Sequence, residues 1–126
     1  MNPIRVMIVD DHDVVRRGLA IFLQSFDDLE LVGQASNGYE ALEVCREVNP
    51  DIILMDLKMP EMDGIAATRA IRREHPHVQI VALTSFRDDD SVQAMMDAGA
   101  IGYLMKNSSI DELARTILSV SSSSTT

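Results

Sequence analysis

Short apolar runs alternate with helical stripes along the whole chain. In five places a mostly apolar run ends at a polar residue or a turn signal, as expected of a buried strand: residues 4–9, 31–35, 51–56, 79–83 and 101–105. After each run, apolar residues recur every three or four positions, as on one face of a helix. The first such stripe is Val15, Leu19, Phe22 and Phe26. The pattern therefore predicts five strands, each followed by a helix.

Polar residues indicate where these helices begin. Asp13 is placed to cap the first helix, and the carboxylates at 88–90 are placed to cap the fourth. Ser109 and Glu112 have the spacing of a capping box before the last helix. The residues of that helix expected to face the core are Ile110, Leu113, Ile117 and Val120. Gly64, in the turn that follows Asp56, is expected to adopt a backbone angle that other residues avoid.

The alternation of strands and helices predicts a doubly wound α/β fold. Such a chain forms a parallel sheet, here five-stranded, with its five helices on both faces. We expect the strand order 2-1-3-4-5, one of the two common orders for this architecture. The 126 residues suffice for one domain, which we place at residues 1–120. Residues 121–126 are all Ser or Thr, and we expect them to form a low-complexity tail.

The composition disfavours several classes of protein. The formal net charge of -9 disfavours direct binding to nucleic acid, which rewards clustered Lys and Arg. The single cysteine, Cys45, cannot form an internal disulfide and is expected to be a small core residue. No apolar run is long enough to span a bilayer, and the first residues lack the apolar region of a signal peptide. We therefore expect a cytoplasmic domain that binds neither DNA nor a membrane directly.

Four of the five predicted strands deliver residues that can do chemistry. Asp10 and Asp11 follow the first strand, and Asp56 ends the third. Thr84 follows the fourth strand, and Lys106 follows the fifth. Because parallel strands point the same way, these residues are expected to share one edge of the sheet. In the order 2-1-3-4-5 the first and third strands are neighbours at the topological switch point, where such sheets bind ligands.

The expected cluster has the chemistry of a phosphoryl-transfer site. Two carboxylates ~4 Å apart repel each other by about 4 kcal/mol at an effective dielectric constant of ~20, so three of them favour a bound cation. Oxygen ligands with an open face suit Mg²⁺, which keeps several of its waters. Lys106 would add a second positive charge and Thr84 a hydroxyl donor. Asp56 could then act as a nucleophile and carry a phosphoryl group as an acyl phosphate.

Each of these residues also has an ordinary structural explanation. An Asp pair after a strand often caps a helix, a Lys after an edge strand is often solvated, and Thr is common at strand ends. His12 can start the first helix or approach a metal ion, and we favour the helix start. The joint placement of the acids, Thr84 and Lys106 on one edge nevertheless favours a functional site.

Four motifs resemble the receiver domain of two-component response regulators, and the likeness covers residues 4–120. They are Val9-Asp10-Asp11-His12, Met55-Asp56-Leu57-Lys58-Met59-Pro60 with Met62-Asp63-Gly64, Leu83-Thr84-Ser85, and Gly102-Tyr103-Leu104-Met105-Lys106. The segments after the first and fourth strands are most similar to the NarL/FixJ (LuxR-type) branch. The resemblance implies the flavodoxin-like fold of CheY, with the strand order given above.

The resemblance also implies roles for individual residues. Asp56 would accept the phosphoryl group from a phosphohistidine on a sensor histidine kinase, or from a small donor such as acetyl phosphate. Asp11 would ligate Mg²⁺ directly and Asp10 would hold a metal-bound water. The main-chain carbonyl of Lys58 would complete the protein ligands, and Lys106 would pair with the phosphoryl oxygens.

The output implied by the resemblance is a conformational switch rather than turnover of a substrate. Thr84 would move towards the phosphoryl group, and Tyr103 would turn inward behind it. The surface formed by the fourth helix, the fifth strand and the fifth helix would then shift between two conformations. This shift would control homodimerisation and an output domain, which is expected to regulate transcription. Receivers of this branch precede a linker and a DNA-binding domain, so residues 121–126 would begin that linker.

Three other classes of protein compete with this interpretation. A phosphatase of the haloacid dehalogenase type would need a second Asp two places after its nucleophile, where this chain has Lys58. A flavodoxin-like FMN binder would need Ser, Thr and Gly after the first strand, where this chain has Asp10 and Asp11. A receiver-shaped module that is never phosphorylated stays open, although the set of acids, Thr84 and Lys106 disfavours it.

Overall fold

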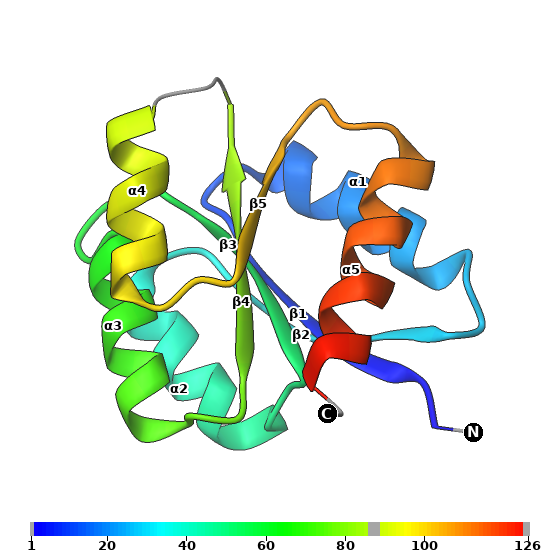
Figure 1. The fold of residues 1–126 in the computed structure, drawn as a ribbon, viewed down its shortest axis with the longest axis horizontal. Helices are drawn as coiled ribbons and strands as arrows, with labels where there is room; N and C mark the ends of the chain where they lie inside the picture. Colours follow the sequence, from blue (N-terminus) through cyan, green and yellow to red (C-terminus); the bar gives the residue numbers. More distant parts are fainter. Residues whose placement is uncertain (1, 86–88, 125–126) are drawn as a thin grey trace.

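The computed structural model describes residues 2–85 and 89–124. Its centre is a five-stranded sheet in which every pair of neighbours is parallel (Figure 1). The strands are β1 (Ile4–Val9), β2 (Leu29–Ala35), β3 (Ile52–Asp56), β4 (Gln79–Thr84) and β5 (Gly102–Met105). Their order is β2-β1-β3-β4-β5, so the predicted fold class and strand order are confirmed.

The helices divide between the two faces of this sheet. They are α1 (Asp13–Gln24), α2 (Gly38–Val48), α3 (Gly64–Glu74), α4 (Asp89–Ala98) and α5 (Ile110–Ser124). Figure 1 shows α1 and α5 on one face and α2, α3 and α4 on the other. Each connection returns the chain to the start of the next strand, so the carboxyl ends of all strands lie at one edge. Within the described ranges, no helix combines the length and apolar character needed to cross a membrane.

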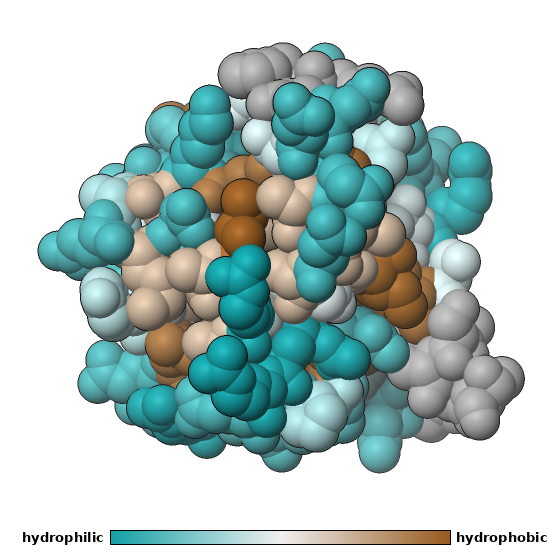
Figure 2. Space-filling model, turned by 60° about the vertical axis from the view of Figure 1, so that its left-hand side comes forward, coloured by the Kyte–Doolittle hydropathy of each residue, from teal (hydrophilic) through white to brown (hydrophobic). Residues whose placement is uncertain are grey.

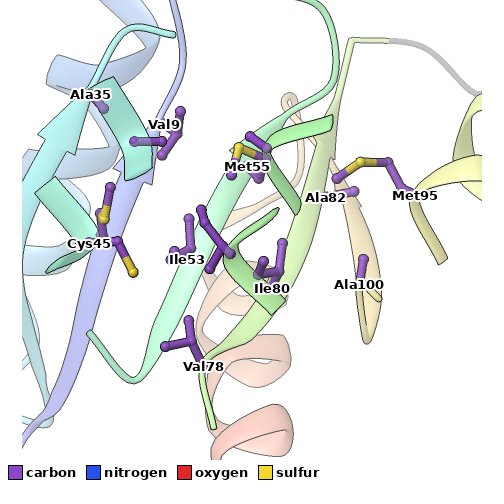
Figure 3. Packing of buried hydrophobic residues seen from close by; sticks show 14 of the residues in the cluster. Val9, Ala35, Cys45, Ile53, Met55, Val78, Ile80, Ala82, Met95 and Ala100 are labelled. Atoms are coloured by element: carbon purple, nitrogen blue, oxygen red, sulfur yellow. The ribbon is translucent and has the colours of Figure 1, made fainter. Parts of the chain in front are cut away.

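Two hydrophobic clusters hold the helices against the sheet. Ile53 and Met55 of β3 belong to the cluster under α2, α3 and α4, whereas Ile52 and Leu54 belong to the one under α1 and α5. This alternation follows from the period of two in a strand. Figure 3 shows the first cluster, where Cys45 lies buried against the sheet as predicted. Because every residue of β3 is buried, the strand is a rigid support for the residue at its end.

The start of α1 differs from the prediction. The N-cap position is occupied by His12, and Asp13 is the first residue of the helix, so the assignment of Asp13 as the cap is wrong. Asp13 pairs instead with Arg16. The carboxylate that accepts a main-chain N–H here is that of Asp10, whose Oδ1 lies 2.8 Å from the His12 nitrogen. The expectation that His12 starts the helix is confirmed.

The last two helices agree with the prediction in part. The hydroxyl of Ser109 accepts a hydrogen bond from the Glu112 nitrogen at 3.1 Å, as a capping residue should. Ile110 is 59% exposed, so its predicted place in the core is wrong. Figure 1 shows this first turn of α5 standing away from the sheet. The helix then runs to Ser124, beyond the boundary we placed at residue 120, while α4 begins at Asp89 and position 88 lies outside the described residues.

Candidate functional site

The carboxyl ends of β1 and β3 bring two buried carboxylates together. The two strands are parallel neighbours, with Val9 level with Met55 in the register. The next residue along each strand is therefore Asp10 on one side and Asp56 on the other, and their side chains are 0% and 7% exposed. Carboxylates are rarely buried to this extent unless they are paired or bind a metal ion.

Lys106 joins these two acids from the far side of the sheet. Its Nζ lies 2.8 Å from Asp10 Oδ2 and 3.1 Å from Asp56 Oδ1. The main-chain nitrogen of Lys106 donates to the carbonyl of Thr84 at 2.7 Å, which holds the residue after β5 against the end of β4. The topology thus brings a lysine 50 positions away in the chain (106 − 56) onto Asp56.

Asp11 and His12 extend the cluster towards solvent. The side chain of Asp11 is 29% exposed and that of His12 is 60% exposed. The Nδ1 atom of His12 lies 3.0 Å from Asp10 Oδ1 and 3.3 Å from Asp11 Oδ1. The residues after β1 therefore present a row of polar groups that runs from the buried Asp10 to the surface.

The surroundings of Asp56 shift its acid–base properties. Burial, reinforced by the negative charge of Asp10, raises the pKa of Asp56 to about 6, while the charge and hydrogen bond of Lys106 act in the opposite direction. Burial alone would lower the pKa of Lys106, but its hydrogen bond to Asp10 and the charge of Asp56 outweigh burial and raise that pKa. Lys106 is thus a buried cation shared by two acids, and Asp56 ionises less readily than an exposed Asp does.

The carboxylates have the arrangement that a divalent cation needs. One ligand atom from each of Asp10, Asp11, His12 and Asp56 lies within 4.8 Å of the others. Oδ2 of Asp56 is a buried oxygen without a hydrogen-bond partner in the described part of the chain, and Oδ1 of Asp11 contacts the His12 ring nitrogen at 3.3 Å. A buried carboxylate oxygen without a partner, in a cluster of acids, indicates an ion that neutralises the charge. The residues present therefore fit a cation that prefers oxygen ligands, such as Mg²⁺.

The two expected switch residues lie in different environments. Thr84 is buried, and its hydroxyl contacts the sulfur of Met105 at 3.3 Å. Tyr103, two residues earlier on β5, is 39% exposed, so its ring lies at the surface of the molecule.

A cavity of about 170 Å³ opens beside Asp56. It is lined on one side by Thr84, Lys106 and the exposed residue Lys58, and on the other by Ser91 and Val92 from the start of α4. Asp56, Lys106 and Thr84, three of the residues that the sequence pointed to, therefore line one opening. The contribution of α4 was missed, because nothing in the sequence shows which turn of a helix will face the edge of a sheet.

Gly64 shapes the loop after Asp56 for a different reason from the one predicted. Its φ is not in the left-handed region. Among the described residues, the glycine with such a φ is Gly99. A Cβ atom at Gly64 would lie 1.9 Å from the main-chain oxygen of Asp56, and the Gly64 nitrogen donates to the carbonyl of Leu57 at 2.8 Å. The glycine is thus required by close approach of two backbone segments, and it fixes the loop over the end of β3.

Arg16 is a further residue at the site that sequence reasoning missed. Its NH1 donates to the main-chain carbonyl of Asp10 at 2.5 Å, and its NH2 pairs with Asp13. The side chain is 19% exposed and brings a positive charge to the back of the acidic loop. The spacing of three residues from Asp13 was a signal that could have predicted the pair.

Comparison with known sequences identifies relatives along nearly the whole chain. Residues 6–118 match the family described as the response regulator receiver domain. The transcriptional regulatory protein LiaR of Bacillus subtilis (strain 168) is 49% identical over 118 residues, which are 94% of this chain and 56% of LiaR. The response regulator GacA of Pseudomonas viridiflava is 44% identical over 114 residues, which are 90% of this chain and 53% of GacA. The chain spans about half the length of these relatives.

Solved structures show the same likeness in three dimensions. A LuxR-family two-component response regulator from Aurantimonas sp. SI85-9A1 superposes with a TM-score of 0.90 at 34% identity, over 97% of this chain and 87% of that one. The signal receiver domain of the response regulator NarL from Mycobacterium tuberculosis superposes with a TM-score of 0.91 at 29% identity, over 97% and 98%. With its sheet order, its cluster of acids and these relatives, the chain belongs to the receiver domains of two-component response regulators.

Proposed function

We propose that this domain is a phosphoacceptor switch and that Asp56 takes its phosphoryl group from a sensor histidine kinase. The single observation that carries this proposal is the buried Oδ2 of Asp56, which has no hydrogen-bond partner among the described residues although Lys106 lies 3.1 Å from the other oxygen. One oxygen is thus held and the other is left to react. An Asp oxygen would form the bond to phosphorus while the bond from phosphorus to the histidine nitrogen of the donor breaks, which gives an acyl phosphate.

The proposed roles of the neighbouring residues follow from their contacts. Asp11 and Asp56 would ligate Mg²⁺ directly, since Oδ2 of Asp56 has no hydrogen-bond partner among the described residues and a ligand oxygen of Asp11 lies within 4.8 Å of the other ligand atoms. Asp10 already uses both oxygens, towards His12 and Lys106, and would hold the ion through a water. The main-chain carbonyl of Lys58 would complete the protein ligands. When bound, Mg²⁺ would offset the negative charge of the phosphoryl oxygens.

Lys106, Thr84 and Tyr103 would convert phosphorylation into a change of shape. Lys106 would follow the phosphoryl oxygens, and the hydroxyl of Thr84 would leave the sulfur of Met105 to bind them. The cavity between the end of β4 and the start of α4 gives room for such movement. Tyr103 would turn from the surface into the space behind Thr84, and the surface of α4, β5 and α5 would shift between two populations.

The proposed partners are a sensor histidine kinase and a second copy of this chain. Met96, Ile101 and Tyr103 are large hydrophobic residues that are 37%, 38% and 39% exposed, on or next to α4 and β5. Figure 2 shows hydrophobic residues gathered in the middle of the face that carries α4, with hydrophilic residues around them. We propose that phosphorylation makes this domain dimerise and that it controls an output domain acting in transcription, joined through a linker that begins within residues 121–126. The net charge of -9 makes direct DNA binding by this domain unfavourable.

The test is the intact mass of the protein after incubation with acetyl phosphate, with and without Mg²⁺. We expect wild type to gain one phosphoryl group in the presence of Mg²⁺ and Asp56→Asn to gain none. Asp97→Asn, a matched change at an exposed Asp of α4, should gain the group as wild type does. No gain in wild type, although Mg²⁺ binds, would contradict phosphorylation by small donors and favour a module that is not phosphorylated. Steady hydrolysis of phosphomonoesters would favour phosphatase chemistry instead.

A further inference from the structure

His12 turns a ring nitrogen towards the acids instead of towards solvent. Its Nδ1 lies 3.0 Å from Asp10 Oδ1 and 3.3 Å from Asp11 Oδ1, although the side chain is 60% exposed. Its main-chain N–H is held as well, by Asp10 Oδ1 at 2.8 Å. The residue is therefore fixed at its backbone, and its imidazole stands at the open side of the acidic cluster.

The same imidazole belongs to the set of groups that could bind one ion. One ligand atom each from Asp10, Asp11, His12 and Asp56 lies within 4.8 Å of the others. Asp56 is 5% exposed, and its Oδ2 has no hydrogen-bond partner in the described ranges. This unsatisfied oxygen indicates a cation independently of the count of acids, because a buried carboxylate oxygen without a partner is costly. A cation in this place would have a nitrogen donor within reach as well as oxygen donors.

We propose that His12 is a ligand of the cation at this site and makes the site favour Ni²⁺ and Zn²⁺ over Mg²⁺ more strongly than the carboxylates alone would. The proposal rests on the metal site of the proposed function. Mg²⁺ takes oxygen ligands and gains little from an imidazole, whereas imidazole suits the later first-row cations. On binding, His12 would exchange its ring contact with Asp10 for the metal bond, and Asp10 Oδ1 would keep the His12 main-chain N–H. The identity of the bound cation would then depend on a residue that the phosphoryl chemistry does not need.

The experiment compares the affinities of Ni²⁺ and Mg²⁺ by calorimetric titration of wild type, His12→Asn and His77→Asn. Asn is a favoured residue at a helix N-cap, so His12→Asn keeps the start of α1. His77 is an exposed histidine whose Nε2 contacts Asn49 at 3.2 Å, and it controls for Ni²⁺ bound at the surface. We expect His12→Asn to weaken Ni²⁺ binding by about tenfold or more, since even the loss of an outer partner of a ligand costs that much. Mg²⁺ binding should change little, and His77→Asn should change neither affinity.

An unchanged ratio of Ni²⁺ to Mg²⁺ affinity in His12→Asn would overturn the proposal. A second readout is the pulsed electron paramagnetic resonance spectrum of bound Cu²⁺, a later first-row cation that imidazole suits, in which wild type should show a directly bonded nitrogen that His12→Asn lacks. A wild-type spectrum with oxygen ligands alone would also overturn it. Asp56→Asn distinguishes a failure of the His12 proposal from a failure of the proposed metal site. If it weakens Mg²⁺ binding while His12→Asn alters nothing, this inference fails and the proposed metal site stands; if it leaves the binding of both ions unchanged, both fail.

Discussion

At the scale of single residues, the site depends on one carboxylate, Asp56, whose negative charge is only partly neutralised by its neighbours. Asp56 has Lys106 on one oxygen and no partner in the described chain on the other, and Asp10 competes for the same lysine. Two acids and one buried cation leave a surplus of negative charge where a phosphoryl group would add more. The surplus favours a bound divalent cation, and it also makes Asp56 costly to ionise in the folded protein.

The pH dependence of stability should report this cost. The pKa of Asp56 is raised from 3.8 to about 6, so its proton is bound more tightly in the folded than in the unfolded protein. Below about pH 4 both states are protonated, and above the folded pKa both are ionised and the folded state bears the full penalty. As the pH rises from 4 to beyond 6, wild type should therefore lose up to about 3 kcal/mol of stability relative to Asp56→Asn.

The measurement is urea unfolding of both proteins in the presence of a chelator, across this pH range. Subtracting the free energies of unfolding of the two proteins removes the contributions of the other titrating groups. At neutral pH, Asp56→Asn should be the more stable protein. A difference that stays constant with pH, or one in which wild type gains stability as the pH rises, would show that Asp56 is not held in an unfavourable environment.

At the scale of elements, the strands were predictable and the helix starts were less so. The run at 51–56 is apolar on both faces, and the structure has β3 at Ile52–Asp56 in the centre of the sheet. Asp13 was the natural cap for α1 from local preference alone. The structure uses Asp10 for the N–H at this point, because the turn after β1 brings that carboxylate back onto His12. Turn geometry of this kind is not contained in residue preferences.

The residues of the site also fall into those that the sequence predicts and those that it does not. The acids, Thr84 and Lys106 follow strands, so the order of the sheet was enough to bring them to one edge. Arg16 and the α4 side of the cavity depend on how helices sit above the sheet, which the chain order does not specify. Gly64 was singled out correctly but explained by a backbone angle, whereas the structure shows a close approach of its backbone to that of Asp56.

The loop that connects β3 to α3 gives a test at this scale. In Gly64→Ala the new Cβ would have to displace the main-chain oxygen of Asp56, which lies 1.9 Å from its position. We expect a loss of about 1–3 kcal/mol of stability and, because the loop carries the end of β3, slower phosphorylation of Asp56. Gly18→Ala is the matched control, since nothing lies within 4 Å of its Cβ position on α1. That change should stabilise the helix by about 0.5–1 kcal/mol. Equal effects in the two variants would argue against a packed loop.

At the scale of the whole molecule, the fold separates the site from the surface that would report on it. The acids lie at the ends of β1 and β3, whereas Met96, Ile101 and Tyr103 lie with α4 and β5, on the other side of β4. Lys106 and Thr84 are the links, because they contact the site or the cavity and also belong to the ends of β4 and β5. Changes at Lys106 or Thr84 should therefore weaken the effect of phosphorylation on this surface while leaving phosphorylation of Asp56 possible.

Lys106→Ala tests this coupling. We expect the variant to bind Mg²⁺ and to be phosphorylated, because Asp11 and Asp56 are retained, but to dimerise less after phosphorylation than wild type does. Sedimentation velocity of the two phosphorylated proteins measures the difference. Arg73→Ala, an exposed cation on α3, should dimerise as wild type does. Dimerisation of phosphorylated Lys106→Ala at the wild-type level would count against Lys106 as the link.

The most direct test is to find which carboxylate carries the phosphoryl group. Wild type is incubated with acetyl phosphate and Mg²⁺, the acyl phosphate is reduced with borohydride, and the modified residue is located by mass mapping of peptides. Asp56 keeps Oδ2 without a partner among the described residues while Lys106 contacts Oδ1, and we therefore expect modification at residue 56 and at no other position. Modification at Asp10 or Asp11, or a phosphorylated protein with Asp56 unmodified, would contradict the assignment of Asp56 as the phosphoacceptor.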